Sequence, residues 1–384
     1  MPSELDMPEE FKIAFVDCNN YQDGYFNAFE ALSNIDDIDL VVHLGDYIYE
    51  YEAGRYADTL LVDRTHLPTN ETITLKDYRI RYAQYRSDPS LQKVHAKFPF
   101  LFIWDDHEFA NDTYKEGAKN HNIDEGSWNK RKEAAEQAYM EWMPIKKSPG
   151  KTPPRQLSVG QLMELVLLEE RTSARTKQIV PCELNVPMPE GHTLLGEEQL
   201  KKLSNTIVEN TKPWTVIANQ VPFTGYKKVD SRFNLKYQDW WLGYPEDRKK
   251  VINALKEAKN KPIILTGDHH RSMVMGVFDD YIDPCNPTYT SDYSKEKPLA
   301  WEILIPSITS KNHDVYQESI VKEYTNKVLD KENNPHTRFA DMNSHGFVIM
   351  HFTPEKAIAK YIFMNTIKKI DSSVGKKLDF ELQY

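Results

Sequence analysis

The sequence predicts an α/β fold in which helices cover mixed β-sheets, and three observations lead to this class. Short apolar runs rich in Val, Ile and Phe recur along the chain, as in strands that are buried on both faces. Helix-like segments alternate with the early runs. The last two runs are separated only by residues 353–356, Thr-Pro-Glu-Lys, which predict a hairpin and therefore an antiparallel pair in the sheet.

The expected strands and helices follow from the spacing of the apolar residues. Strands are expected at residues 11–18, 39–46, 98–106, 164–171, 214–220, 262–268, 301–307, 345–352 and 357–363. Helices are expected at residues 25–33, 75–96, 127–143, 196–210 and 246–258, and another shortly before residue 330. The polar stretches do not separate independent sets of strands. We therefore expect one domain over residues 1–384, with loop insertions near 144–160, 279–300 and 311–344.

Composition limits the partners of the chain. With 384 residues, of which 40% are hydrophobic, the chain can bury a large core, and it contains no apolar run long enough to span a bilayer. The formal net charge of -10 argues against stable binding of nucleic acid. An acidic protein can still bind phosphate esters if metal ions concentrate positive charge at the site.

The N-terminus and the cysteines bear on the compartment. Residues 1–10 lack the basic start and apolar middle of a signal peptide, so we expect either a processed periplasmic or secreted form or a cytoplasmic protein. Three cysteines do not suggest a disulfide scaffold. Cys182 and Cys285 lie in Pro-rich stretches and are expected to be free surface thiols, although they could pair in an oxidising compartment. Nothing in the sequence points to an oligomeric state.

Polar side chains follow the expected strands at the points where the strands end. In α/β sheets, ligands bind at this carboxyl edge. Clustered carboxylates repel one another there unless a cation offsets their charge, and carboxylate and amide oxygens suit divalent ions. The residues concerned are Cys18, Asp46 with Tyr49, Asp105 to Glu108, Asn219, and Asp268 to His270.

Each signal also has an ordinary explanation. A Gly-Asp pair such as Gly45-Asp46 usually forms a turn or caps a helix, and a lone Cys18 is more often a small buried side chain than a ligand. The four ionisable residues 105–108 are harder to dismiss, because they directly follow the apolar run 100–104. Because such groups recur at the ends of successive apolar runs, the sequence predicts a metal site.

These residues resemble the PhoD-like alkaline phosphatases, a family distantly similar to purple acid phosphatases. The similarity covers residues 18–26, 43–51, 78–89, 98–111, 117–144, 214–223, 265–270 and 345–354. It implies the calcineurin-like metallophosphatase fold, a four-layer α/β/β/α sandwich. It implies Fe(III) held by Cys18, Asp46, Tyr49 and His270, and Ca(II) held by Asp46, Asp106, Asn219 and Asp268, with room for a further calcium.

The resemblance also implies a reaction. A ferric ion would lower the pKa of a bound water and supply hydroxide near neutral pH, and both metals would stabilise the phosphate oxygens. The catalytic residues are then Asp46, which bridges the metals, and His107, which protonates the leaving alkoxide. Arg175 is a candidate for the phosphate contact. The family's common Arg-Gly-Tyr near the C-terminus is His345-Gly346-Phe347 here, which leaves open any contact made by that arginine.

Two alternatives to a phosphatase remain at this stage. The same site could act mainly as a phosphodiesterase or nuclease, although the acidic net charge weighs against long nucleic acids. A protein that keeps the fold but only binds calcium or a partner would lose the ligands of the iron, and Cys18, Asp46, Tyr49 and His270 are all present. We therefore expect a phosphate-ester hydrolase that acts on monoesters, diesters or both.

Overall fold

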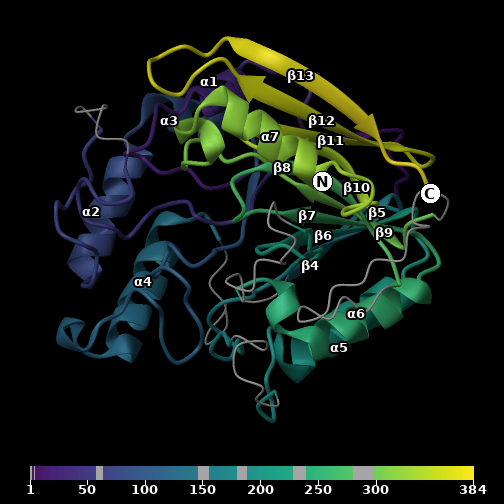
Figure 1. Ribbon diagram of the computed structural model, residues 1–384, viewed down its shortest axis with the longest axis horizontal. Helices are drawn as coiled ribbons and strands as arrows, with labels where there is room; N and C mark the ends of the chain where they lie inside the picture. The colour runs from purple at the N-terminus through teal and green to yellow at the C-terminus, as the bar shows by residue number, and fades with distance from the viewer. Residues whose placement is uncertain are drawn as a thin grey trace.

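Two β-sheets lie face to face in the computed structural model, and helices cover the outer face of each sheet (Figure 1). This arrangement confirms the predicted α/β fold of four layers. The structure describes residues 2–3, 5–57, 64–145, 155–179, 188–227, 239–279 and 297–384.

The first sheet has the strand order β13-β12-β11-β1-β2-β3. The strands β1, β2 and β3 run parallel, whereas β11 is antiparallel to β1, β12 to β11 and β13 to β12. The predicted hairpin between β11 and β12 is therefore confirmed. The bounds are β1 Phe11–Val16, β2 Leu40–His43, β3 Phe100–Phe102, β11 Gly346–Phe352, β12 Ala357–Met364 and β13 Val374–Glu381.

The second sheet has the order β10-β8-β9-β7-β6-β5-β4. Its central strands β5, β6, β7 and β9 are parallel, and antiparallel strands flank them on both sides. The bounds are β4 Arg155–Val159, β5 Met163–Leu167, β6 Trp214–Asn219, β7 Lys261–Thr266, β8 Ser272–Val277, β9 Ala300–Leu304 and β10 Thr337–Asp341.

Apolar side chains on both faces explain why the strand sequences are nearly continuous apolar runs. In β1, Ile13 and Phe15 pack into the cluster between the two sheets, while Ala14 and Val16 pack against the helices of the first sheet. Successive side chains of a strand point to opposite faces, so a strand that is covered on both sides needs apolar residues at every position.

The helices form the two outer layers. The first sheet is covered by α1 Asn27–Ser33, α2 Leu75–Arg86, α3 Pro89–Lys97 and α4 Trp128–Trp142. The second sheet is covered by α5 Gly196–Glu209, α6 Pro245–Lys256 and α7 Glu318–Val328, and α5 and α6 lie side by side in Figure 1. Short 3₁₀ helices occur at Ile123–Glu125, Trp241–Gly243 and His313–Val315. Among the residues that the structure describes, no helix combines the length and apolar character needed to cross a bilayer.

The structure corrects the expected helix at residues 75–96, which is in fact two helices. The first ends at Arg86, and Asp88 then caps the second by accepting hydrogen bonds from the backbone N–H groups of Ser90 and Leu91. Pro89 occupies the first turn of α3, where its missing N–H is not needed, whereas it would interrupt the hydrogen bonds of a continuous helix.

Several strands were not predicted. The strand β4 lies in the expected loop at 144–160, and β10 lies in the expected loop at 311–344; β8 and β13 were also missed. In β13 only Leu378 and Phe380 pack against the core, so its sequence carries little apolar signal. The expected loop at 279–300 falls mostly outside the described residues.

The parallel strands determine where the loops meet. Since β1, β2 and β3 in one sheet and β5, β6, β7 and β9 in the other are parallel within their sheets, the segments that follow them gather at the carboxyl edges. The polar residues noted in the sequence lie in these segments.

Candidate metal centre

Four different chemical groups converge after β1, β2 and β7. The carboxylate oxygen Oδ2 of Asp46 lies 3.4 Å from the Cys18 Sγ and 2.9 Å from the Tyr49 hydroxyl. The same hydroxyl lies 3.2 Å from Nε2 of His270. All four side chains are buried. A thiol, a phenol, an imidazole and a carboxylate thus surround one point, and these groups suit a transition metal when the acidic ones are ionised.

The backbone at these positions adopts a conformation that is rare for residues with side chains. The φ angle is +51° at Cys18, +54° at Asp46, +59° at Asp268 and +62° at His270. Such left-handed residues cost about 1–3 kcal/mol each and persist only where the surroundings hold them. Gly45, with φ +110°, allows the close approach of the segment that follows β3, because a Cβ there would lie 2.5 Å from the Cβ of Asp105.

His270 is oriented by a neighbouring carbonyl. Its Nδ1 lies 3.0 Å from the Lys311 carbonyl oxygen, so a proton on Nδ1 can be donated there while the lone pair of Nε2 faces Tyr49 and Asp46. Histidines that bind metals are usually held in this way through the second ring nitrogen. The Tyr49 hydroxyl also accepts a hydrogen bond of 2.6 Å from Ser310.

A second group of carboxylates adjoins the first. Asp46, Asp106 and His107 place ligand atoms within 4.8 Å of one another, and so do Asp105, Asp106 and Asp268. Two buried oxygens of this group, Oδ2 of Asp105 and Oδ1 of Asp106, accept no hydrogen bond from the residues that the structure describes. Unpartnered buried carboxylate oxygens are costly in a protein interior, and a cation is the usual partner. The residues therefore fit a divalent metal beside the first group.

The electrostatics of the edge favour a cation as well. Burial raises the pKa of Asp105 to about 6, and it raises the pKa values of Asp46 and Asp268 well above the usual range. Burial likewise raises the pKa of the Cys18 thiol. A bound cation opposes each of these shifts, because it favours the ionised forms.

Glu108 holds the two acidic segments together. Its carboxylate accepts hydrogen bonds from the backbone N–H groups of Asp105, Asp46 and Tyr47, at 2.8, 3.0 and 2.7 Å. Glu108 is fully buried, and burial raises its pKa to about 7. The sequence placed Glu108 at a strand end but did not show this structural role.

His107 is held at the edge by Glu50. Its Nδ1 lies 2.6 Å from Oε2 of Glu50, and its ring stacks on Tyr49 with the centroids 4.2 Å apart. Burial acts to lower the pKa of His107, but the nearby carboxylates, chiefly Asp106 and Glu50, raise it well above its ordinary value. His107 therefore lies in an environment that favours its protonated form. Glu50, which was not predicted as a site residue, also accepts from the N–H of Asn111.

Asn219 and Arg175, two residues singled out in the sequence, both make hydrogen bonds to other side chains. Asn219 is buried at the end of β6, where its side-chain oxygen accepts a hydrogen bond of 2.9 Å from the Trp241 indole; its role as a calcium ligand stays a prediction. Arg175 is fully buried, and its guanidinium donates to Asp239 and Tyr244. The structure thus does not support Arg175 as a phosphate contact.

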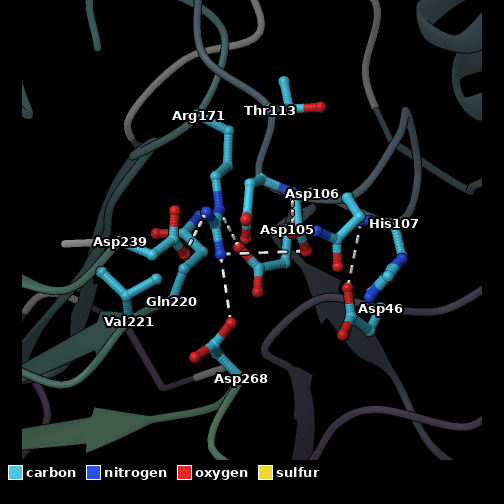
Figure 2. A network of polar contacts seen from close by, with 12 residues as sticks. Asp46, Asp105, Asp106, His107, Thr113, Arg171, Gln220, Val221, Asp239 and Asp268 are labelled. Carbon is cyan, nitrogen blue, oxygen red and sulfur yellow. Dashed lines mark hydrogen bonds and ion pairs between the residues drawn. The ribbon is translucent and has the colours of Figure 1, made fainter. Parts of the chain in front are cut away.

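A buried arginine at the acidic edge was missed from the sequence. Arg171 forms ion pairs with Asp105, Asp239 and Asp268 (Figure 2). No apolar run precedes Asp239, so no strand-end signal could have revealed it. Cys18 is a free cysteine, whereas Cys182 and Cys285 lie outside the described residues.

Comparison with known proteins matches residues 13–361 to the PhoD-like phosphatases. The chain is 32% identical to the alkaline phosphatase D of Bacillus subtilis (strain 168) over 385 residues, which cover 97% of this chain and 62% of that protein. The chain thus spans less than two thirds of that relative's length.

Two solved structures are similar. The structure of PhoD superposes with a TM-score of 0.82 at 30% identity, covering 99% of this chain and 71% of that one. A purple acid phosphatase from yellow lupin seeds matches with a TM-score of 0.53 at 13% identity, over 97% of this chain and 54% of that one. The second likeness shows a shared fold only.

The geometry around Cys18 predicts the effect of removing its thiol. The family resemblance implies iron in this group, and a serine hydroxyl is not readily ionised, so on that assignment Cys18→Ser should lose iron and most activity while the fold and calcium binding survive. Cys18→Asp should recover part of both, because it restores an ionised ligand. Iron content measured in the wild type and both variants, with circular dichroism as the fold control, checks this. Full iron and full turnover in Cys18→Ser would show that the thiol is only a small buried side chain.

The contacts of Glu108 predict a loss of stability. In Glu108→Gln one carboxylate oxygen becomes an NH₂ group that faces a backbone N–H, so at least one buried donor loses its acceptor. We expect a loss of about 1–3 kcal/mol in the free energy of unfolding, measured with urea. The exposed Glu133 on α4 provides the control, because Glu133→Gln should change stability by less than about 0.5 kcal/mol. Equal urea midpoints for both variants would contradict the bridging role of Glu108.

Proposed function

The chain belongs to the PhoD-like phosphatase family, and we propose that it is a metal-dependent phosphoesterase that hydrolyses phosphate monoesters, diesters or both. The observation that carries the proposal is the convergence of Cys18, Tyr49 and His270 on the carboxylate of Asp46, next to a second acidic group. A structural role for so many buried ionisable groups would leave their desolvation uncompensated.

The two groups of side chains suit different metals. We assign iron to Cys18, Asp46, Tyr49 and His270, since thiolate and phenolate stabilise a ferric ion. We assign calcium to Asp46, Asp106, Asn219 and Asp268, since oxygen ligands suit this ion. Bound there, the metals would activate a water and offset the charge that develops on the phosphate oxygens.

The protein's own residues contribute orientation and a proton. Asp46 belongs to both ligand sets and so fixes their separation. The Nδ1–H of His107 donates a hydrogen bond to Glu50, which holds the ring beside Asp46 and Asp106. A protonated His107 can donate to the departing alkoxide oxygen, which requires its other nitrogen to face the substrate. Glu50 acts as the positioning residue for this proton donor.

The location and the domain organisation stay predictions. We retain the expectation of a periplasmic or secreted protein, with the cytoplasm as the alternative, and of one domain, in which the segments expected as loops at 144–160 and 311–344 contribute β4 and β10 to the second sheet. The main alternatives in function are a preference for diesters and a calcium-binding protein without turnover.

Activity assays separate these possibilities. The purified protein should hydrolyse p-nitrophenyl phosphate, bis-p-nitrophenyl phosphate or both, and the ratio of the two rates assigns the preference. Removal of metal with a chelator should abolish turnover, and iron with calcium should restore it. Metal-loaded protein that hydrolyses neither ester would refute the proposed function.

The contacts of His107 predict how its loss affects different leaving groups. His107→Asn should lower kcat by roughly 10²–10⁴ for an alkyl phosphate, whose leaving group needs a proton. The loss should be smaller for a p-nitrophenyl ester, because nitrophenolate leaves without protonation. Metal content measured in the same samples controls for loss of ligands. Equal losses for both substrates would show that His107 only supports the structure or the metals.

A further inference from the structure

Arg171 is a buried cation enclosed by carboxylates of the acidic group. Its side chain is fully buried, and its Nε donates to Asp105. One terminal nitrogen lies 2.6 Å from Asp239, and the other lies 3.2 Å from Asp268 and 3.8 Å from Asp106 (Figure 2). Three of these four carboxylates, those of Asp105, Asp106 and Asp268, also form a group that could hold a metal.

We propose that Arg171 is a positioning residue for the second metal, which the proposed function identifies as calcium. Two proposed calcium ligands, Asp106 and Asp268, lie against one guanidinium nitrogen. A guanidinium is planar and donates in fixed directions, so it sets the orientation of each carboxylate that it binds. Arg171 therefore holds the carboxylate of Asp268 by a hydrogen bond and attracts that of Asp106 by charge, so both carboxylates lie beside one guanidinium nitrogen before a metal binds.

The guanidinium of Arg171 is held in place by Asp239, which other side chains also bind. Asp239 accepts from Arg171 through Oδ2, while its Oδ1 accepts from Arg175 at 2.5 Å and from Gln178 at 2.7 Å. The Trp240 indole lies 3.3 Å from Oδ2 of Asp268 and restrains that carboxylate from the other side. Because the guanidinium is enclosed in this way, Arg171 acts through the carboxylates and does not contact the substrate.

Arg171 alone does not balance the negative charge of the carboxylates around it. One guanidinium faces four carboxylates, so it offsets only part of their negative charge when they are ionised. Oδ2 of Asp105 and Oδ1 of Asp106 still accept no hydrogen bond within the described part of the chain. A divalent cation would satisfy these oxygens. The guanidinium and the metal would then each offset part of the negative charge of the acidic group.

Arg175 offers a matched control. It is as deeply buried as Arg171, and it binds Asp239 as well. Its other contacts with described residues are to Tyr244 and backbone oxygens, so among these residues its link to the proposed calcium ligands runs through Asp239. Loss of Arg175 therefore measures the cost of removing a buried arginine from this region without removing the contact to the ligands.

The test is the affinity for calcium, measured by titration of iron-loaded protein with calcium chloride. Arg171→Gln and Arg171→Lys should each weaken calcium binding by about 10–100-fold, which is typical for loss of a group that orients metal ligands. The visible absorption of the iron should persist, because Arg171 pairs with Asp105, Asp106, Asp239 and Asp268 and with none of the iron ligands. Arg175→Gln should weaken calcium binding much less.

Three variants, Arg171→Gln, Arg171→Lys and Arg175→Gln, distinguish a positioning role of Arg171 from a purely structural one. Should Arg171→Gln fail to fold by circular dichroism, Arg171→Lys carries the comparison, since it keeps the charge and loses only the planar fork. Calcium affinity equal to wild type in Arg171→Lys, or an equal loss in Arg175→Gln, would overturn the positioning role. A wild-type protein that binds neither iron nor calcium would instead overturn the proposed function, and the role of Arg171 with it.

Discussion

The main physical constraint on this structure is the negative charge of the carboxylates clustered at the carboxyl ends of its strands. Asp46, Asp105, Asp106 and Asp268 are clustered there, and burial raises the pKa values of several of them. Such a cluster is unfavourable by itself, because desolvation and mutual repulsion both act against ionised carboxylates. Its existence requires compensating positive charge, which this chain supplies partly through Arg171 and His107 and, on our account, partly through metal ions.

The scaffold makes this concentration of charge possible. Strands with two buried faces anchor the loops in a large apolar core, and the energy of that core can offset the local costs at the edge. Buried carboxylates with structural roles then hold the loops. Glu108 joins the segments that follow β2 and β3, and Glu50 fixes His107. The hydrogen bond from the Asp46 N–H to Glu108 also helps to hold Asp46 in its left-handed conformation, which would otherwise be unfavourable.

Sequence reasoning succeeded where one local rule decided the outcome. Apolar runs followed by polar residues located the central strands and placed Cys18, Asp46, Tyr49 and His270 at strand ends, where parallel strands direct their loops to one edge, while the grouping of these four residues came from the family resemblance. It failed where tertiary contacts decided. The strand β13 has a mostly exposed sequence, and Asp239 reaches the site from a segment without any local signal. Arg171 ended an expected strand, yet its role depends on carboxylates from three other segments.

The most direct test of the account is the metal content of protein purified without chelator, combined with its visible absorption spectrum. We predict bound iron and calcium, with a charge-transfer band from the bond between Tyr49 and Fe(III). In Tyr49→Phe this band should disappear while calcium remains. Protein that is fully active with zinc alone or with no metal, or an iron-loaded Tyr49→Phe variant that keeps the band, would contradict the assignment of the edge as an iron and calcium site.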